Sequence, residues 1–339
     1  MEQGINYTKY GLVEKGGIWY GKKGNYWSNL SKDKNKNFVA DLKENRAYDV
    51  MKKHFPQHEE VIYSCKRVGG IATLDITDND IILDAGCMWG ALSVPLARTG
   101  AKITALDQTK ESLLFLKRRK EDESLDNLDI ICADLKTQEL PGDTYTKVIV
   151  NGVLEWVPHN SDVEVNSGNT KKVKNINYKS SPRQIQLDFL KKLIDSLKDN
   201  GTLYLAIENR YDFLYFVGLP EPHCNIRFIS FMPRWIQDIM HKITKGSKFR
   251  NWTYSRRKLV ELIEDAGFKN VKISYAFPDY RTPELIISDY GMKKHYRYNS
   301  PLGKSSFLKK VVIRSVEFFV YKLFRMTMFA PAFIVHAEK

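Results

Sequence analysis

The sequence contains few of the features that mark secreted, membrane-spanning or zinc-binding proteins. It has only four cysteines, Cys65, Cys87, Cys132 and Cys224, and no two of them form a CxxC pair. This spacing argues against a zinc site and a disulfide framework, so we expect reduced thiols and no metal site. No uninterrupted apolar run reaches the ~20 residues that a helix needs to cross a bilayer. The segment from Met1 to Tyr7 lacks a basic patch followed by an apolar stretch, so we expect no secretory signal and a cytoplasmic location.

Acidic residues are in the minority. The 339 residues include 53 Lys and Arg against 40 Asp and Glu, a net charge of +13. This excess favours an anionic partner, such as nucleic acid, a nucleotide-sugar, a lipid-linked pyrophosphate or an acidic membrane surface. The alternative is a basic protein without such a partner. With 43% hydrophobic residues, the chain can bury one large core, so we expect a single catalytic domain with insertions.

A βαβ unit is predicted where residues 81–90, IILDAGCMWG, give a buried strand and a glycine turn. Residues 91–98 predict the following helix, and the apolar run 103–107 predicts a second strand that ends in Asp107. Glycine lets the backbone approach a ligand closely, and a carboxylate after the second strand can accept hydrogen bonds from a ribose diol. The pattern therefore predicts a nucleotide site. The alternative is a turn that only packs a helix on the sheet.

Strands and helices continue to alternate along the chain, which is typical of a doubly wound, Rossmann-like α/β sheet. We expect a sheet of seven strands. Residues 1–60 form an N-terminal extension with a loop at Ser31–Lys36 and a helical run through Val50–Phe55, and Gly201 is the expected left-handed cap of a helix. The other predicted strands are 128–132, 147–150, 202–207, 271–275 and 332–337, and the other predicted helices are 110–121, 184–198 and 254–266.

The glycine turn resembles the first motif of class I S-adenosylmethionine-dependent methyltransferases more than a dinucleotide fingerprint. Asp84 stands where that family has an acidic residue near the methionine ammonium, and Met88 stands where a dinucleotide fold has glycine. Met88 also departs from the commonest methyltransferase form, which has glycine there. The resemblance implies S-adenosyl-L-methionine as cofactor, with these contacts: Asp84, Gly86, Gly90, Asp107, Asp134 at the adenine amine, and Asn151 at the methionine pocket. Alternatively, Asp134 caps a turn or helix and Asn151 makes a turn.

Three further segments resemble motifs of methyltransferases from surface-polysaccharide and O-antigen gene sets, which are often fused to glycosyltransferases. They are residues 151–159 after the fourth strand, Ile207–Tyr211 as an acidic-Asn-Arg motif, and Gly218–His223 as a Gly-x-x-Glu-Asp-His motif in which Pro222 replaces aspartate. The similarity covers about residues 63–339. It implies a methyltransferase domain over 61–339, a reversed C-terminal β-hairpin, and acceptor-site insertions around 160–181, 210–252 and 280–329.

The chemistry that this resemblance implies is modest, because a sulfonium already carries the activated methyl group and the protein mainly aligns an in-line displacement. A saccharide hydroxyl needs a general base, for which His223 is the first candidate because imidazole titrates near neutrality. Glu155 and Glu208 are the alternatives, since both are expected at the carboxyl ends of strands. His223 could instead be a loop histidine that bonds backbone, and Glu208 could pair with Arg210.

Residues 307–329 predict an apolar helix with a narrow polar stripe, formed by Lys310, Arg314, Glu317, Tyr321 and Arg325. Such a helix could contact the inner face of a membrane where lipid-linked glycans are assembled, or it could pack on the sheet.

We therefore predict an S-adenosylmethionine-dependent methyltransferase that O-methylates a saccharide or glycolipid precursor. Its acceptor would be a saccharide, a nucleotide-sugar or a lipid-linked glycan, and a glycosyltransferase is a candidate partner. A nucleic-acid methyltransferase ranks second. A non-catalytic partner protein that keeps the fold is a further alternative, suggested by Met88 and Pro222. The absence of glycine at the third position of the turn, where Met88 stands, and the expected seventh strand argue against an NAD-dependent oxidoreductase.

Overall fold

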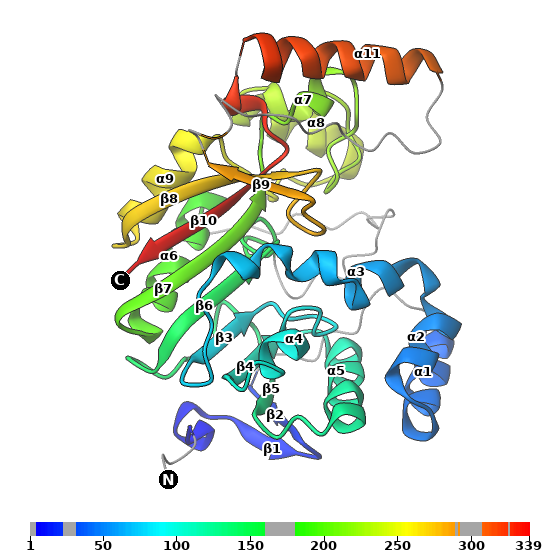
Figure 1. Cartoon of the computed structure of the whole chain (residues 1–339), viewed down its shortest axis with the longest axis vertical. Helices are drawn as coiled ribbons and strands as arrows, with labels where there is room; N and C mark the ends of the chain where they lie inside the picture. The colour runs from blue at the N-terminus through cyan, green and yellow to red at the C-terminus, as the bar shows by residue number, and fades with distance from the viewer. Residues whose placement is uncertain (1–4, 23–31, 160–179, 289–290, 292–306, 325) are drawn as a thin grey trace.

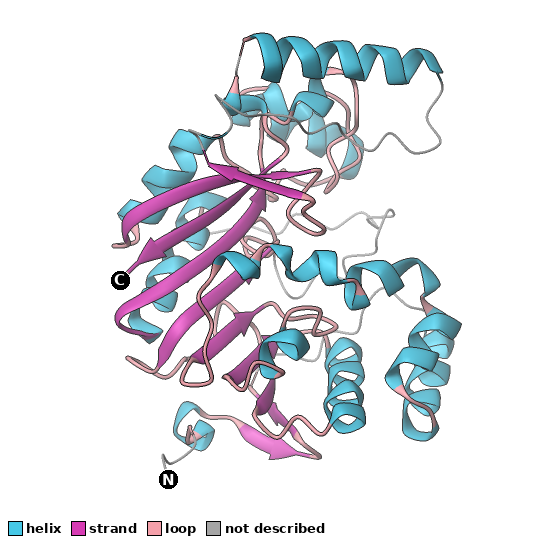
Figure 2. Ribbon diagram, in the orientation of Figure 1, coloured by secondary structure: helices cyan, strands magenta, loops and turns pink. Residues whose placement is uncertain are grey.

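A sheet of ten strands runs through the molecule, with helices on both of its faces (Figures 1 and 2). The computed structural model describes residues 5–22, 32–159, 180–288, 291, 307–324 and 326–339. The strand order is β1-β2-β5-β4-β3-β6-β7-β10-β8-β9.

Five parallel strands form the middle of the sheet, and their residues alternate between two apolar layers. In β3, for example, Ile82 and Leu83 are both fully buried but belong to different core clusters. This continuous apolar pattern is typical of parallel strands that are covered on both faces. The five strands, in spatial order, are β5 (Leu128–Cys132), β4 (Lys102–Asp107), β3 (Ile81–Ala85), β6 (Tyr145–Asn151) and β7 (Leu197–Glu208).

The sheet is wider than the seven strands predicted, because three short strands extend its edges. β1 and β2 come from the N-terminal extension, and β2 pairs with β5. β9 pairs with β8 at the other edge. Strands of three or four residues carry too short an alternation to be recognised in a sequence, and a sheet edge recruits them by offering unpaired backbone groups. The three are β1 (Val13–Lys15), β2 (Ile18–Tyr20) and β9 (Leu285–Ser288).

The last strand, β10 (Ala332–Glu338), lies antiparallel between β7 and β8 (Lys269–Phe277). β8 and β10 are therefore adjacent and antiparallel, as the expected hairpin requires. They are joined by a long connection that contains β9 and a helix, and not by a tight turn.

Helices cover the two faces as a doubly wound fold requires. α6 and α9 contribute to the core on one face, and α4 and α5 contribute to the core on the other. The N-terminal helices α1 and α2 pack outside α5. The helices are α1 (Lys32–Glu44), α2 (Ala47–His54), α3 (Glu59–Tyr63), α4 (Ser93–Ala97), α5 (Lys110–Glu123), α6 (Pro182–Ser196), α7 (Phe213–Phe216), α8 (Arg234–Lys245), α9 (Arg256–Asp265) and α11 (Phe307–Glu317).

Two local predictions were wrong. The expected loop at Ser31–Lys36 is the first turn of α1 from Lys32 onward. Gly201 is not a left-handed cap, because α6 ends at Ser196 and β7 begins at the next residue; the left-handed residue is Asn200, with φ +61°. Asparagine tolerates this conformation better than most residues. The pairing of β7 with β6 begins at Leu197, so strand residues stand where the polar residues had suggested the end of a helix.

At one end of the long axis, α7, α8 and α11 lie beyond the sheet (Figure 1). α11 continues into a π-helical turn, η6 (Phe318–Leu323). None of the helices in the described ranges has the length and hydropathy needed to cross a bilayer. Most of the predicted insertion at 160–181, and Arg325 of the polar stripe, lie outside the described residues.

Candidate active site

The turn between β3 and α4 depends on two glycines in the left-handed region. Gly86 has φ +90° and Gly90 has φ +71°. A Cβ on Gly86 would lie 2.3 Å from Val153 Cγ2, and one on Gly90 would lie 2.2 Å from Leu116 Cδ1. The space that these glycines leave is therefore filled by protein side chains, so the packing role considered as the alternative applies to both.

Asp107 ties this turn to the end of β4. Its Oδ2 accepts a hydrogen bond from the Met88 amide at 3.0 Å, and its Oδ1 accepts one from the Thr109 amide at 2.8 Å. Met88 has φ +43°, which is uncommon for a residue other than glycine, and its side chain is half exposed. The backbone thus takes at Met88 a conformation that glycine adopts without strain.

The outer side of the turn is held by α5 and the N-terminal helices. Arg119 is buried, and its Nη1 donates to the carbonyl oxygens of Trp89 at 3.1 Å and Gly90 at 2.8 Å. The Trp89 ring packs against Phe38 of α1 and Phe115 of α5 at centroid distances of 5.7 and 5.3 Å. The N-terminal extension therefore supports the turn directly.

Asp84 and Asn151 lie together at the carboxyl ends of β3 and β6. They line a small cavity of about 20 Å³ with Gly86 and with Arg67, which comes from the segment between α3 and β3. Asn151 Oδ1 is buried and has no hydrogen-bond partner among the described residues. Asp84 accepts a hydrogen bond from Ser93 Oγ at 2.5 Å, and burial raises its pKa to about 6.

Arg67 is the residue of this cavity that the sequence did not reveal. It lies in a 3-10 turn, η3 (Cys65–Gly69), and its Nε and Nη1 are shielded from solvent with no partner in the described part of the chain. Burial lowers its pKa. One arginine among 53 basic residues carries no local signal, and only the docking of the segment before β3 brings it beside Asp84.

Asp134 follows β5, next to the strand that ends in Asp107. Its Oδ1 accepts a hydrogen bond from the Lys136 amide at 2.8 Å, and its carbonyl accepts from the amides of Thr137 and Gln138. Asp134 therefore makes the turn contacts considered as the alternative to an adenine contact, which stays a prediction.

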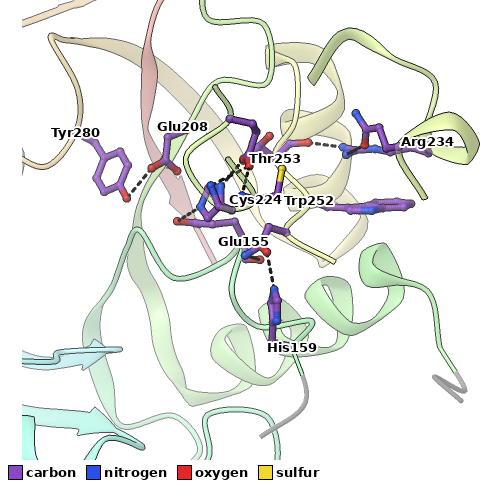
Figure 3. Close-up of polar contacts among 12 residues, drawn as sticks. Glu155, His159, Glu208, Cys224, Arg234, Trp252, Thr253 and Tyr280 are labelled. Carbon is purple, nitrogen blue, oxygen red and sulfur yellow. Dashed lines mark hydrogen bonds and ion pairs between the residues drawn. The ribbon is translucent and has the colours of Figure 1, made fainter. Parts of the chain in front are cut away.

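The three predicted catalytic residues lie together, at and beyond the ends of β6 and β7. Figure 3 labels two of them, Glu155 and Glu208. Glu208 ends β7, and its Oε1 accepts a hydrogen bond from Tyr280 Oη at 3.1 Å. Glu155 is fully buried, four residues after Asn151. His223 Nε2 lies 3.9 Å from Glu155 Oε1, and its Nδ1 lies 2.5 Å from Glu221 Oε1.

Burial and the neighbouring carboxylates act in opposite directions on the pKa of His223. Burial disfavours a charged imidazole at His223, but Glu155 and Glu221 outweigh burial and hold the pKa of His223 well above its usual value. Burial and the neighbouring Glu155 raise the pKa of Glu208. The assumption of an unperturbed imidazole was therefore wrong, because carboxylates face both ring nitrogens.

Arg210 and a second cavity do not belong to this cluster. Arg210 does not pair with Glu208; its guanidinium donates to the carbonyl oxygens of Ser230 and Met232 at 2.7 and 2.6 Å. A wider cavity of about 780 Å³ lies at the amino ends of the parallel strands, where Ile81 and Lys102 begin β3 and β4. Open α/β sheets bind ligands at the carboxyl ends of their strands, so this cavity is not the expected cofactor site.

One known protein family matches the part of the chain that contains the glycine turn. Residues 82–167 match the family model described as "Methyltransferase domain". The chain carries a methyltransferase domain. The matched residues begin in β3 and extend past the Glu155 segment, so they include the glycine turn, Asp107 and Asn151.

Curated relatives match the chain over short stretches. The chain is 29% identical over 82 residues to (S)-coclaurine N-methyltransferase of Thalictrum flavum subsp. glaucum, covering 24% of this chain and 22% of that protein. It is 36% identical over 76 residues to ubiquinone biosynthesis O-methyltransferase of Methylocella silvestris, covering 22% and 29%. It is 29% identical over 119 residues to a probable ribosomal RNA small subunit methyltransferase A of Methanosphaera stadtmanae, covering 35% and 40%. The chain thus spans well under half of each relative.

Solved structures also resemble the chain. Phosphoethanolamine N-methyltransferase 2 of Haemonchus contortus, in complex with S-adenosyl-L-methionine, aligns with a TM-score of 0.46 and 10% identity over 89% of this chain and 60% of that one. A SAM-dependent methyltransferase from Methanosarcina mazei aligns with a TM-score of 0.45 and 15% identity, over 79% and 96%.

S-adenosylmethionine is the cofactor of this methyltransferase domain, and it supplies a methyl group activated on a positive sulfur. The residues around the small cavity, together with Asp107 at the end of β4, suit its polar groups. The Asp107 carboxylate can accept hydrogen bonds from the ribose diol, and the shielded N–H groups of Arg67 suit the methionine carboxylate. The unpartnered Asn151 Oδ1 and the Asp84 carboxylate suit the ammonium group.

Proposed function

We propose that this chain is an S-adenosylmethionine-dependent methyltransferase that transfers the methyl group, in line, to a hydroxyl oxygen of a saccharide or glycolipid precursor. The observation that carries the proposal is the pair of neighbouring carboxylates formed by Glu155, which is fully buried, and Glu208, whose Oε2 is shielded from solvent. Both side chains can accept a hydrogen bond, and both lie at the carboxyl ends of the parallel strands. Glu155 closely follows Asn151, which lines the cofactor cavity. Carboxylates in such a place suit the binding and deprotonation of a hydroxyl acceptor.

The base role is best filled by a carboxylate. Carboxylates face both ring nitrogens of His223 and favour its protonated form, so without a bound cation His223 acts less well as a base than as a charged neighbour. Glu155 has two oxygens without a hydrogen-bond partner among the described residues, and Glu208 has one. In this proposal one of these two carboxylates takes the proton of the hydroxyl group. His223 then holds the second carboxylate in place.

Calorimetric titration with S-adenosylmethionine and its demethylated product tests the cofactor first, with NAD as a control and Asp107→Ala alongside. We expect both sulfur compounds to bind, more weakly to the variant, and NAD not to bind. Failure of both to bind the wild-type chain at millimolar concentration would contradict the proposal.

Methyl transfer from a labelled cofactor to a panel of acceptors then tests the substrate class. The panel should include free saccharides, nucleotide-sugars and lipid-linked glycans, and each should be tried with and without a glycosyltransferase partner. We expect methylation of a saccharide hydroxyl, abolished in Glu155→Gln. Cofactor binding without turnover on any acceptor would favour the non-catalytic alternative.

A nucleic-acid acceptor is the second candidate, because one curated relative is named as a ribosomal RNA methyltransferase and this chain carries a charge of +13. Methylation of RNA with a steep loss of affinity between low and moderate salt would favour this function over the first.

The lipid-linked form of the acceptor suits the exposed apolar residues at the end of the molecule that holds α8 and α11. Along α8, Trp235, Ile239 and Ile243 are exposed at four-residue intervals, which places them on one face. In α11 and the turn after it, Phe307, Phe318 and Phe319 are also exposed. Basic residues lie near both groups: Lys242, Lys245, Arg314 and Lys322. An anionic bilayer surface is the occupant that matches apolar side chains with a basic border.

Co-sedimentation with vesicles tests this contact. We expect binding to vesicles that contain anionic lipid and loss of binding in Ile243→Glu. Val13→Glu is the matched control, because Val13 is a comparably exposed aliphatic residue of β1, at the opposite edge of the sheet. Equal binding of both variants, or none by the wild type, would refute the contact and leave the methyltransferase proposal standing.

A further inference from the structure

Three side chains from different parts of the chain converge where β7 ends and beyond the end of β6. Glu155, Glu208 and His223 each bring one potential ligand atom to within 4.8 Å of the other two. Glu155 and Glu221 are nearly or fully shielded from solvent, as is the His223 side chain. The cluster is therefore an interior site rather than an exposed acidic patch.

The carboxylate oxygens of this site lack partners. Both oxygens of Glu155 and Oε2 of Glu208 are buried without a hydrogen bond among the residues that the structure describes. The nearest cationic atom to Glu155, His223 Nε2, lies 3.9 Å away, beyond hydrogen-bond distance. Buried carboxylate oxygens cost free energy when they are unsatisfied, so this arrangement calls for a further positive group.

The surroundings orient the three side chains toward one point. Glu221 Oε1 accepts from His223 Nδ1, and Glu221 Oε2 accepts from the amides of His223 and Cys224, both at 2.8 Å. This leaves His223 Nε2 facing Glu155 and Glu208. Tyr280 donates to the other oxygen of Glu208. A carboxylate behind a histidine, and a hydrogen bond behind a ligating carboxylate, are the second layer that metal sites use to fix their ligands.

Charge also favours a cation. Three carboxylates, of Glu155, Glu208 and Glu221, face one imidazole. In the described part of the chain, neither Glu155 nor Glu208 forms an ion pair with lysine or arginine. The nearby Arg281 pairs with Asp279 at 3.0 Å.

We propose that Glu155, Glu208 and His223 Nε2 bind one divalent transition-metal cation, of the Mn²⁺ or Zn²⁺ class. Carboxylate oxygens with one imidazole nitrogen suit these ions, and three protein ligands leave positions open. The sequence predicted no metal site because residues 155, 208 and 223 form no local spacing motif. A cation here would lower the pKa of an oxygen bound to it, and that consequence for an acceptor hydroxyl rests on the proposed function.

Calorimetric titration of the chelator-treated, dialysed full chain with Mn²⁺, and separately with Zn²⁺, tests the site. We expect one ion per chain, with affinity at least about tenfold lower in Glu155→Gln and in Glu208→Gln. Asp41→Asn is the matched control, because Asp41 and His54 form a carboxylate–histidine pair at 2.6 Å outside the site. Circular dichroism melts show whether each variant folds, and the variant that folds decides the test.

Stoichiometric binding lost in the site variants and kept in Asp41→Asn would support the proposal. Absence of stoichiometric binding to the wild type, or equal affinity in the folded site variants, would overturn it. Titration of the same samples with S-adenosylmethionine separates the two proposals: a chain that binds the cofactor without a metal refutes only the metal site, and the converse refutes only the proposed function.

Discussion

Replacing Arg67 with methionine should strengthen folding and weaken cofactor binding at the same time. Nε and Nη1 of Arg67 are shielded and lack partners among the described residues. An unsatisfied buried polar group costs about 1–3 kcal/mol, and methionine keeps much of the aliphatic stem. We therefore expect the free energy of unfolding to rise by about 1–3 kcal/mol in the absence of cofactor.

The effect on binding has the opposite sign. If the guanidinium receives the methionine carboxylate, the variant loses a charge-assisted contact worth about 1.5–3 kcal/mol, which corresponds to a Kd for S-adenosylmethionine higher by about ten- to hundredfold.

Urea unfolding measures the first effect and calorimetric titration the second. Arg98→Met is the control, because Arg98 forms an exposed ion pair with Glu123 at 2.6 Å and should change stability by less than about 1 kcal/mol. Unchanged cofactor affinity in Arg67→Met would refute the assignment. A loss of stability in place of a gain would show that Arg67 holds the fold together.

Three other predictions concern the turn and a buried carboxylate. Met88→Gly should raise the free energy of unfolding by about 1 kcal/mol in urea titration, because it removes a left-handed conformation from a side-chain-bearing residue; no gain would contradict the strain. Gly90→Ala should lower the melting temperature and cost about 1–3 kcal/mol or more, since its Cβ would meet Leu116 at 2.2 Å, and a neutral result would show that α5 can move. Burial raises the pKa of Asp212 to about 7, above its value in the unfolded chain, so stability should fall as pH rises from about 4 to 7, on the order of 4 kcal/mol at most. Unfolding measured across this range should be flatter in Asp212→Asn, which keeps a capping side chain, and parallel curves would contradict the assigned pKa.

Much of the central fold could be predicted from the sequence, because its signals are local. β5 has the bounds predicted from its apolar run, and the glycine turn and Asp107 lie where the βαβ pattern put them. Hydrophobic periodicity and turn residues act over a few positions, so a continuous apolar strand or a left-handed glycine leaves its mark in neighbouring residues.

The site is different, because it is made by distant contacts. Glu155, Glu208 and His223 were candidates from motifs, but only the packed chain brings Glu155 and Glu208 to His223, and these carboxylates help to raise the pKa of its ring. Arg67 reaches the cofactor cavity only because the segment that precedes β3 folds back beside that strand. Sequence alone therefore determined the βαβ core, where each residue's partners are near it in the chain. Tertiary structure decided the protonation and partners of the site, because burial and electrostatic neighbours depend on which distant segments meet.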